Sequence, residues 1–193
     1  MSKGKLIVLS APSGTGKTSI CKELLKRNKE WKFSVSATTR PPRENEKDGV
    51  DYIFLSVQKF EHFVKFGDFL EWEWVHGNKY GTLIAPLEDL IDDGHLVVLD
   101  IDVKGGMTVM DEFPDETISI FVEPPGEELQ DKIETLEERL KKRGNDSPTL
   151  IKQRIKRFPL ELEYKEKFHY SFINKNIKET TLKIEKLIKE KIK

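Results

Sequence analysis

Cysteine and long apolar runs are both scarce in this sequence of 193 residues. The single cysteine, Cys21, excludes an internal disulfide framework and is typical of a reducing compartment. The first apolar run, Leu6 to Leu9, is too short for a secretory signal, and no run approaches the ~18–20 residues of a membrane span. The sequence therefore predicts a soluble, cytoplasmic protein without membrane association.

An excess of charge of either sign is also lacking. Lys and Arg total 33, Asp and Glu total 34, and the net charge is −1. Nucleic-acid binding needs a positive excess, so we expect no nucleic-acid partner. With 37% hydrophobic and 35% charged residues, the chain can form a sizeable core under an ionic surface. Its length predicts about one domain at roughly 150 residues per domain.

Short apolar segments alternate with longer helical patterns. Residues 5–10, 95–100, 117–122 and 170–173 read as strands, most of them as continuous apolar runs buried on both faces. Helical patterns follow at about 17–28, between 127 and 143, from 147 onward and at 177–192. This alternation predicts an α/β fold with a parallel sheet flanked by helices. The segment from about 33 to 82, with strand patterns at 33–37, 51–55 and 69–75, reads as a strand-rich insertion.

A phosphate-binding loop follows the first strand at residues 11–18. The pattern G-x-x-x-x-G-K-[ST] fits except at its first position, where Ala11 replaces glycine. Backbone N–H groups of such a loop cradle phosphate oxygens, the lysine reaches the β- and γ-phosphates, and the hydroxyl faces Mg²⁺. The predicted ATP-binding residues of this loop are Ser13, Gly14, Thr15, Gly16, Lys17 and Thr18.

A second acid completes a typical P-loop metal site. Asp100 ends the buried strand at 95–100, where open α/β sheets place their ligands, and Asp102 follows on the same face. We expect Thr18 and Asp100 to organise Mg²⁺ beside the phosphates.

The segment 34–54 predicts a second phosphate site. Arg40 and Arg43 flank two prolines, and paired guanidinium groups suit a phosphate. Further along, Glu71 lies in an aromatic strand. Its carboxylate can accept both N1–H and N2–H₂ of a guanine ring, and Ser36 or Thr82 can address the O6 or N7 atom.

Several further motifs recur in order along nearly the whole chain. They are S-x-S-x-T-T-R-x-P-R at 34–43, D-G-x-D-Y at 48–52, F-L-E-W at 69–72, G-N-x-Y-G-T at 77–82, L-D-I-D at 99–102 and R-L-x-x-R-G at 139–144. Together with the P-loop, these motifs resemble those of the guanylate kinases, which transfer the γ-phosphoryl group of ATP to GMP.

The resemblance implies a single domain with three parts. The P-loop core would comprise about 1–32, 83–125 and 168–193, the GMP-binding insertion about 33–82, and a helical lid about 126–167. It also implies ATP and GMP (with dGMP) as nucleotide partners, Mg²⁺ as cofactor, and a role in purine nucleotide metabolism. The expected state is a monomer, with a dimer left open.

The resemblance also assigns roles to individual residues. The GMP-binding set is Ser36, Arg40, Arg43, Tyr52, Glu71, Tyr80, Thr82, Asp100 and Asp102. Asn174 joins the P-loop residues in binding ATP, at the adenine. The residues expected to handle the moving phosphoryl group are Lys17, Arg43, Arg139, Arg143 and Arg154. Arg157 matches no motif, and we read it as structural.

Three features depart from the family pattern. Extra residues lengthen the helix before Arg139 by about two turns. Pro159 falls inside a lid helix, so we expect a kink near residues 155–158. Lys175 stands where an Asp often follows the adenine-contacting Asn174.

Two alternatives remain at this stage. Guanylate kinase-like domains of scaffold proteins bind peptides and have lost catalytic P-loop residues, whereas Lys17 and Thr18 are present here. A P-loop kinase with another acceptor, such as a thymidylate or metabolite kinase, is the second. We interpret Trp72 and Trp74 as core or sheet-packing residues and not as a platform for base stacking.

Overall fold

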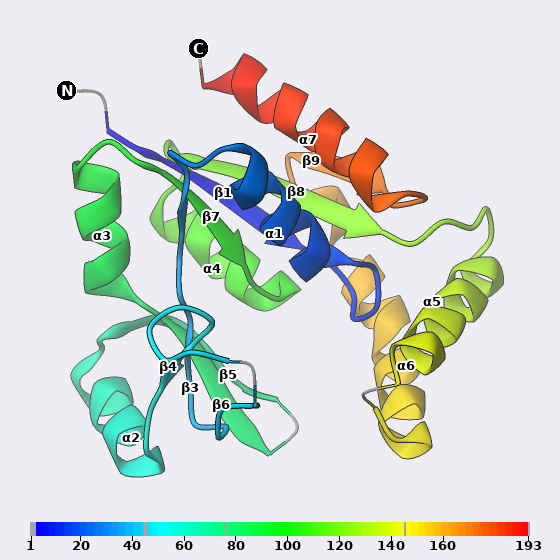
Figure 1. Cartoon of the computed structure of the whole chain (residues 1–193), viewed down its shortest axis with the longest axis horizontal. Helices are drawn as coiled ribbons and strands as arrows, with labels where there is room; N and C mark the ends of the chain where they lie inside the picture. The colour runs from blue at the N-terminus through cyan, green and yellow to red at the C-terminus, as the bar shows by residue number, and fades with distance from the viewer. Residues whose placement is uncertain (1–2, 45, 76, 145, 193) are drawn as a thin grey trace.

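The computed structural model describes residues 3–44, 46–75, 77–144 and 146–192, which form two sheets and a helical hairpin (Figure 1). The main sheet has five parallel strands in the order β2-β7-β1-β8-β9. Their bounds are β1 Lys5–Ser10, β2 Lys32–Phe33, β7 Leu96–Asp100, β8 Thr117–Glu123 and β9 Tyr170–Ile173. The predicted α/β fold with a parallel sheet is confirmed.

Helices cover both faces of the main sheet. They are α1 Lys17–Arg27 and α7 Ile177–Lys191 on one face, and α3 Ile84–Asp92 and α4 Val103–Glu112 on the other. Within β1, Ile7 and Leu9 pack in the cluster with α1 and α7, while Leu6 and Val8 pack in the cluster with α3 and α4. Alternate side chains of a strand point to opposite faces, so both sets must be apolar here.

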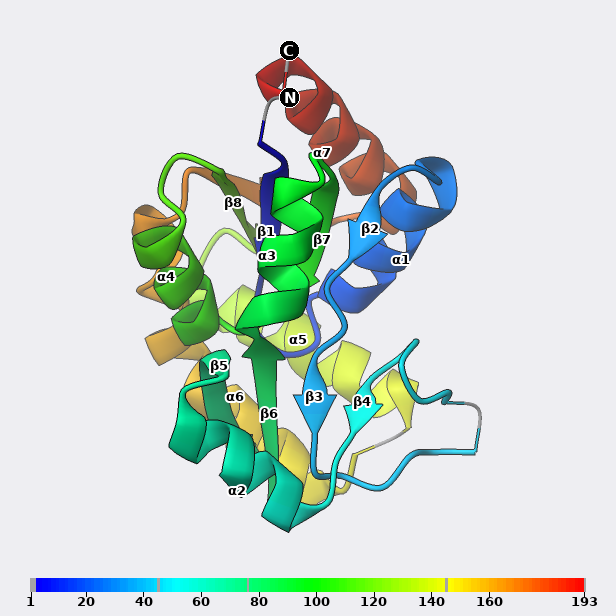
Figure 2. The same ribbon diagram turned by 90° about the vertical axis from the view of Figure 1, so that its left-hand side faces the viewer.

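A second sheet lies beyond the carboxyl ends of the main strands (Figure 2). Its order is β4-β3-β6-β5, with β3 parallel to β4 and antiparallel to β6. Its elements are β3 Ala37–Thr38, β4 Ile53–Phe54, α2 Val57–Phe66, β5 Phe69–Val75 and β6 Asn78–Leu83. Phe60 of α2 stacks on Phe69 with ring centroids 4.3 Å apart, which joins the helix to the sheet.

Two details of the strand-rich segment differ from the sequence prediction. The expected single strand at 33–37 is two short strands in different sheets, β2 in the main sheet and β3 in the second. The tryptophans do not belong to the core, since Trp72 is 42% and Trp74 60% exposed, but Trp72 packs edge-on against Phe60 with ring centroids 6.4 Å apart. The buried ammonium of Lys79 lies over both indole rings, 5.3 and 5.7 Å from their centroids. A cation–π contact of this kind stabilises an aromatic ring on the outer face of the sheet.

Helices α5 Leu129–Arg143 and α6 Pro148–Leu162 form a hairpin, which we call the lid (Figure 1). Ser147 caps α6, since its hydroxyl accepts a hydrogen bond from the backbone N–H of Leu150 at 3.3 Å. The helix includes Pro159 and continues to Leu162. A short 3₁₀ helix, η1 Lys165–Lys167, then leads to β9.

A buried carboxylate joins both ends of the lid to the main sheet. Glu123, the last residue of β8, is 2% exposed. Its two carboxylate oxygens form ion pairs with Lys132 of α5 at 2.7 Å and with Lys165 of η1 at 2.9 Å. Burial raises the pKa of Glu123, but the two lysines lower it by a larger amount, so the net shift is downward.

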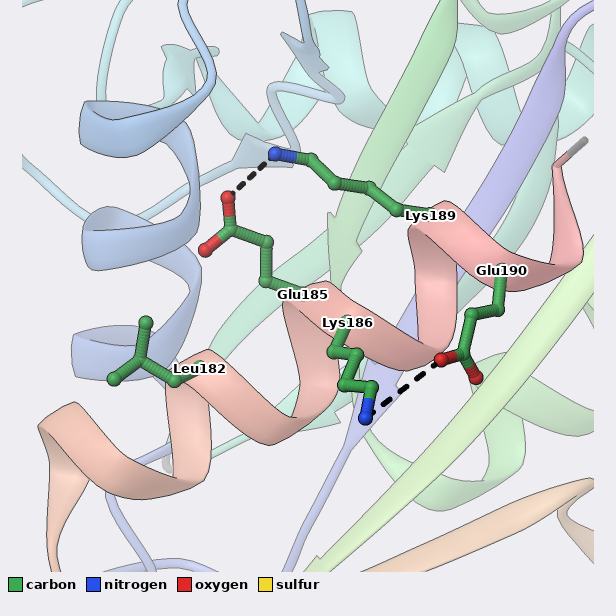
Figure 3. A pocket seen from close by; sticks show the side chains of 5 residues that line it. All are labelled: Leu182, Glu185, Lys186, Lys189 and Glu190. Carbon is green, nitrogen blue, oxygen red and sulfur yellow. Dashed lines mark hydrogen bonds and ion pairs between the residues drawn. The ribbon is translucent and has the colours of Figure 1, made fainter.

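Charged side chains on α7 surround a shallow hollow, shown in Figure 3. Glu185 pairs with Lys189 at 2.7 Å and with Arg27 of α1 at 2.7 Å, while Lys186 pairs with Glu190 at 3.9 Å. These groups pair with one another and hold α7 against α1, so we assign the hollow a structural role. In the part of the chain that the structure describes, no helix is both long enough and apolar enough to cross a bilayer.

Candidate functional site

A cavity of about 920 Å³ lies between the carboxyl ends of the main strands, the second sheet and the lid. Most predicted site residues line it: Ser13, Gly14, Thr15, Gly16, Lys17, Thr18, Ser36, Arg43, Tyr52, Glu71, Tyr80, Asp100, Asp102, Arg139, Arg143 and Arg154. Arg40, Thr82 and Asn174 lie just behind this wall. Each of these three hydrogen-bonds a residue that lines the cavity.

The loop between β1 and α1 forms one end of the cavity. Gly14 and Gly16 have φ values of 92° and 96°. Residues that carry a Cβ atom rarely adopt this left-handed conformation. A Cβ atom at Gly16 would also lie 2.7 Å from Nδ2 of Asn174. These two glycines let the loop curl into a concave nest at the N-terminus of α1, where backbone N–H groups favour phosphate oxygens.

Lys17 points from this loop toward the end of β7. Its ammonium lies 2.8 Å from Oδ1 of Asp100 and donates to the carbonyl of Ile101. Burial lowers the pKa of Lys17, but Asp100 more than offsets this effect, so the net shift is upward. The lysine therefore stays protonated and is held at the place where nucleotide phosphates meet the loop.

The second sheet and the loop between β3 and β4 bring two arginines and two tyrosines to one side of the cavity. The guanidinium of Arg40 donates to Oε1 of Glu46 at 2.8 Å and to the hydroxyl of Tyr80 at 3.3 Å. The Tyr52 ring meets Tyr80 edge-on, with centroids 5.9 Å apart. Arg43 is 70% exposed and reaches Glu46 only at 4.0 Å. Arg40 is thus braced, while Arg43 is free to turn toward a ligand.

Glu71 faces the cavity from β5 and has a strongly perturbed pKa. Its Oε1 accepts a hydrogen bond from the hydroxyl of Thr82 at 2.6 Å. Burial raises the pKa of Glu71 to about 7, and the charges of Asp102 and Glu73 add to the rise. A Cβ atom at Gly105 would lie 3.0 Å from the Glu71 carboxyl carbon, so α4 packs tightly beside this group. A buried carboxylate with an unfilled acceptor suits a ligand that brings its own donors.

Asp102 lies beside Glu71 at the start of α4. Its Oδ1 accepts from the backbone N–H of Gly105 at 2.8 Å, which caps the helix. Glu73, two residues beyond Glu71 on the same face of β5, pairs with Lys104 at 3.0 Å. The carboxylates of Glu71, Glu73 and Asp102 and the ammonium of Lys104 therefore lie where the second sheet meets α4.

The lid brings three arginines to the cavity, and two of them contact the P-loop. Arg139 donates to the carbonyl oxygens of Thr15 at 3.3 Å and Asn174 at 2.9 Å. Arg154 donates to the hydroxyl of Ser13 and lies 3.3 Å from Asp146, which also pairs with Arg143. Burial lowers the pKa of Arg139, which reflects a partly desolvated charge. Such guanidinium groups are suited to bind phosphate oxygens.

Asn174 follows β9 and lies behind the P-loop. Its amide Nδ2 donates to the carbonyl of Thr15 at 2.6 Å. Its Oδ1 is buried and has no hydrogen-bond partner within the described residues. Asn174 therefore keeps one unsatisfied acceptor directly behind the P-loop.

Six charged residues that line the cavity belong to no motif that we recognised: Lys22, Glu46, Glu73, Asp146, Arg157 and Glu161. Of these, Glu46 and Asp146 brace the arginines. The structural reading of Arg157 did not anticipate its position on the cavity wall. Arg157 and Glu161 follow Arg154 by three and seven residues, so all three share one face of a helix. This spacing is the one signal that could have located Arg157 and Glu161.

The cavity offers a partial set of ligands for a cation. Thr18 contributes a hydroxyl and Asp100 a carboxylate. Among the described residues no three His, Cys, Asp or Glu side chains gather to hold a metal ion. This donor set fits Mg²⁺, which takes one or two protein ligands and completes its shell with water and phosphate oxygens.

A parallel sheet, a phosphate loop after its central strand and a converging set of arginines define a P-loop nucleotide phosphotransferase. The comparisons with known proteins narrow this class. The family model described as Guanylate kinase matches residues 3–191, and the chain belongs to the guanylate kinase family.

Individual relatives extend over nearly the whole chain. A guanylate kinase of Clostridium tetani is 42% identical over 188 residues, 97% of this chain and 86% of that protein. One of Fusobacterium nucleatum is 40% identical over 193 residues, and both chains are fully covered. The crystal structure of guanylate kinase from Anaplasma phagocytophilum superposes with a TM-score of 0.78 at 31% identity, covering 98% of this chain and 87% of that one. The predicted family is confirmed.

Proposed function

We propose that this cavity is where the chain performs the reaction of its family. The chain is a nucleoside monophosphate kinase that phosphorylates GMP at the expense of ATP. One observation carries the assignment to this cavity: the P-loop lysine, the lid arginines and the partly buried carboxylate of Glu71 all line it.

On the donor side, the P-loop nest binds the ATP phosphates. Lys17 neutralises the β- and γ-phosphates, and the hydroxyl of Ser13 and the backbone around Gly14 approach the same oxygens. We assign the adenine to the region of Asn174, supported by the open Oδ1 acceptor of that residue.

On the acceptor side, Arg40 and Arg43 bind the phosphate of GMP together with the hydroxyls of Tyr52 and Tyr80. The braced position of Arg40 supports this role, because a preorganised donor loses little entropy on binding.

The guanine ring lies farther along the second sheet. Glu71 accepts N1–H and N2–H₂, Asp102 adds a second acceptor, and Ser36 and Thr82 contact the remaining edge. The buried position of Glu71 supports selectivity for guanine, since adenine lacks these two donors.

The transfer itself needs no covalent intermediate and no dedicated general base, because the acceptor is an anionic phosphate oxygen. Arg43 holds that oxygen in line with the γ-phosphorus. Arg139, Arg143 and Arg154 stabilise the negative charge of the transferred phosphoryl group. Asp100 keeps Lys17 aligned at 2.8 Å.

Thr18 and Asp100 are the residues that would hold Mg²⁺ in this cavity. When bound there, the ion would supply positive charge that neutralises the nucleotide phosphates.

We further propose that the three parts have separate tasks: nucleotide-binding core, GMP-binding insertion over about 33–82, and lid over about 126–167. Closure of the last two over the bound substrates would exclude water and so suppress ATP hydrolysis. A monomeric state and a cytoplasmic location remain part of the proposal. The location is supported by the single cysteine, Cys21, which is buried and unpaired.

The acceptor assignment is tested by incubating the enzyme with ATP, Mg²⁺ and each of GMP, dGMP, AMP, UMP, CMP and dTMP, with ADP release as the readout. We expect GMP to be used at a kcat/KM at least ~100-fold above AMP, the scale of discrimination by paired buried hydrogen bonds. Equal use of AMP or dTMP would contradict the guanine site. Absence of any GMP-dependent ADP release would favour a binding module instead.

A further inference from the structure

Helix α6 presents a row of ionisable side chains to the cavity. Arg154, Arg157 and Glu161 are spaced by three and four residues, so they lie on one face of the helix, and all three line the cavity. In Figure 1 this helix runs from the tip of the lid back to the main sheet. The row therefore starts at the middle of the helix and ends in its last turn, on the side of the main sheet.

Arg157 is the loosely held member of the row. Its Nε lies 3.4 Å from Oε1 of Glu161, and its side chain is 46% exposed. Water reaches the Arg157 end of this pair, so the contact with Glu161 holds the guanidinium only weakly. Arg154, in contrast, is held by both Ser13 and Asp146. Arg157 can thus leave Glu161 at little cost and bind another anion.

Glu161 itself occupies an anion position at the P-loop. Its side chain is 18% exposed, and a hydrogen bond from the backbone of Ser13 favours its charged form. Burial raises its pKa and the nearby Asp102 adds to the rise, while Arg157 and Lys17 oppose it. Backbone N–H groups of a phosphate loop are the donors that nucleotide phosphates use. A carboxylate and a terminal phosphate cannot both occupy this place, because their negative charges repel.

We propose that Glu161 stands in for the terminal phosphate of a nucleoside triphosphate in the ligand-free enzyme, and that Arg157 is a further phosphate-binding guanidinium that Glu161 holds until the phosphate arrives. Binding of the triphosphate displaces the carboxylate from Ser13, and Arg157 transfers from Glu161 to the incoming phosphate. The inference rests on the proposed function, since it places ATP on this loop.

The affinity for ATP in the absence of acceptor tests both halves of the proposal. The Glu161→Gln variant keeps the shape of the side chain but removes the competing charge, so we expect the Kd for ATP, measured by titration calorimetry, to fall by ~3-fold or more. The Arg157→Gln variant should raise this Kd by ~10-fold, the value of one charge-assisted hydrogen bond, and Arg157→Lys should recover part of the loss.

Lys156→Gln is the matched control, because Lys156 is exposed, adjacent and outside the cavity lining. Its Kd should match that of the wild type. An unchanged or weaker ATP affinity in Glu161→Gln, or an unchanged affinity in Arg157→Gln, would overturn the proposal. Because Arg157 is half-exposed, its substitution reports on binding even if Glu161→Gln unfolds. Failure of the proposed function would appear separately, as a wild-type enzyme that binds ATP but forms no ADP with GMP.

Discussion

At the residue scale, we expect the choice of acceptor base to depend on Glu71, a partly buried carboxylate on the cavity wall. Glu71 receives a single hydroxyl hydrogen bond, from Thr82 at 2.6 Å, and lies against the backbone of α4 at Gly105. Burial without a cation at contact distance raises the pKa of Glu71 to about 7. A guanine ring would supply two donors to this site, so binding and ionisation of Glu71 are linked.

Replacing Glu71 by Gln should impair the use of GMP far more than the binding of ATP. The amide presents one acceptor in place of two, and its own N–H₂ group opposes the guanine donors. We expect KM for GMP to rise by ~10-fold or more, with the Kd for ATP changed less than ~2-fold. Steady-state kinetics with GMP and calorimetry with ATP measure the two effects. An equal loss of both would contradict the guanine role.

The same group predicts a pH dependence. Because the free Glu71 carboxyl has a raised pKa of about 7, it is increasingly protonated below pH 7 and must lose its proton before it can accept from guanine. The Kd for GMP should therefore increase as pH falls from 8 to 6, approaching ~10-fold per unit below the pKa. The Glu71→Gln variant should lack this component. GMP phosphate protonation affects both proteins alike, so an identical pH profile for the two would contradict the linkage.

Individual site residues were predictable where a short motif fixes their chemistry. Lys17 and Thr18 follow from the P-loop pattern, and Asp100 from its place at a strand end. Arg157 and Glu161 were not identified, because their role depends on which face of α6 meets the P-loop, and that orientation is set by tertiary packing.

At the element scale, the lid is held at both of its ends by one buried group. Glu123 is 2% exposed and pairs with Lys132 near the start of α5 and with Lys165 after α6. Lys132 lies in the part of α5 that precedes Arg139, where the sequence predicts extra turns relative to the family. The pair with Glu123 fixes this part of the helix to the main sheet.

Replacing Glu123 by Gln should destabilise the protein. Removing one partner of a buried ion pair leaves the other unpaired, but Lys132 and Lys165 are 14% and 31% exposed, so water relieves part of the penalty. We expect the free energy of unfolding in urea to fall by about 1–3 kcal/mol. Glu137→Gln, which removes an exposed pair with Lys141 on the same helix, is the control and should change it by less than ~0.5 kcal/mol. Equal effects would show that Glu123 is no anchor.

Elements with strong local signals were predicted well, and those defined by long-range pairing were not. The apolar run at 5–10 coincides with β1, and Ser147-Pro148 marks the start of α6 as expected. The alternating pattern at 33–37 was read as one strand, yet Phe33 and Ala37 pair in different sheets. A change of sheet within five residues leaves no trace in hydrophobic periodicity.

At the scale of the whole molecule, three parts enclose one cavity, and each contributes charge of a particular kind. The core supplies Lys17 and backbone N–H groups, the second sheet supplies Arg40, Arg43 and Glu71, and the lid supplies further arginines. A chain with a net charge of −1 can therefore bind two polyanionic nucleotides, because the positive charge is gathered where phosphates meet.

The central claim is that phosphoryl transfer from ATP to GMP occurs in this cavity with Lys17 at its centre. The most direct test is the rate of GMP-dependent ADP release by the Lys17→Ala variant under saturating substrates. Loss of a positioned charge at the moving group should lower kcat by at least ~100-fold, while the protein remains folded by circular dichroism. A kcat within a few-fold of the wild-type value would contradict the account.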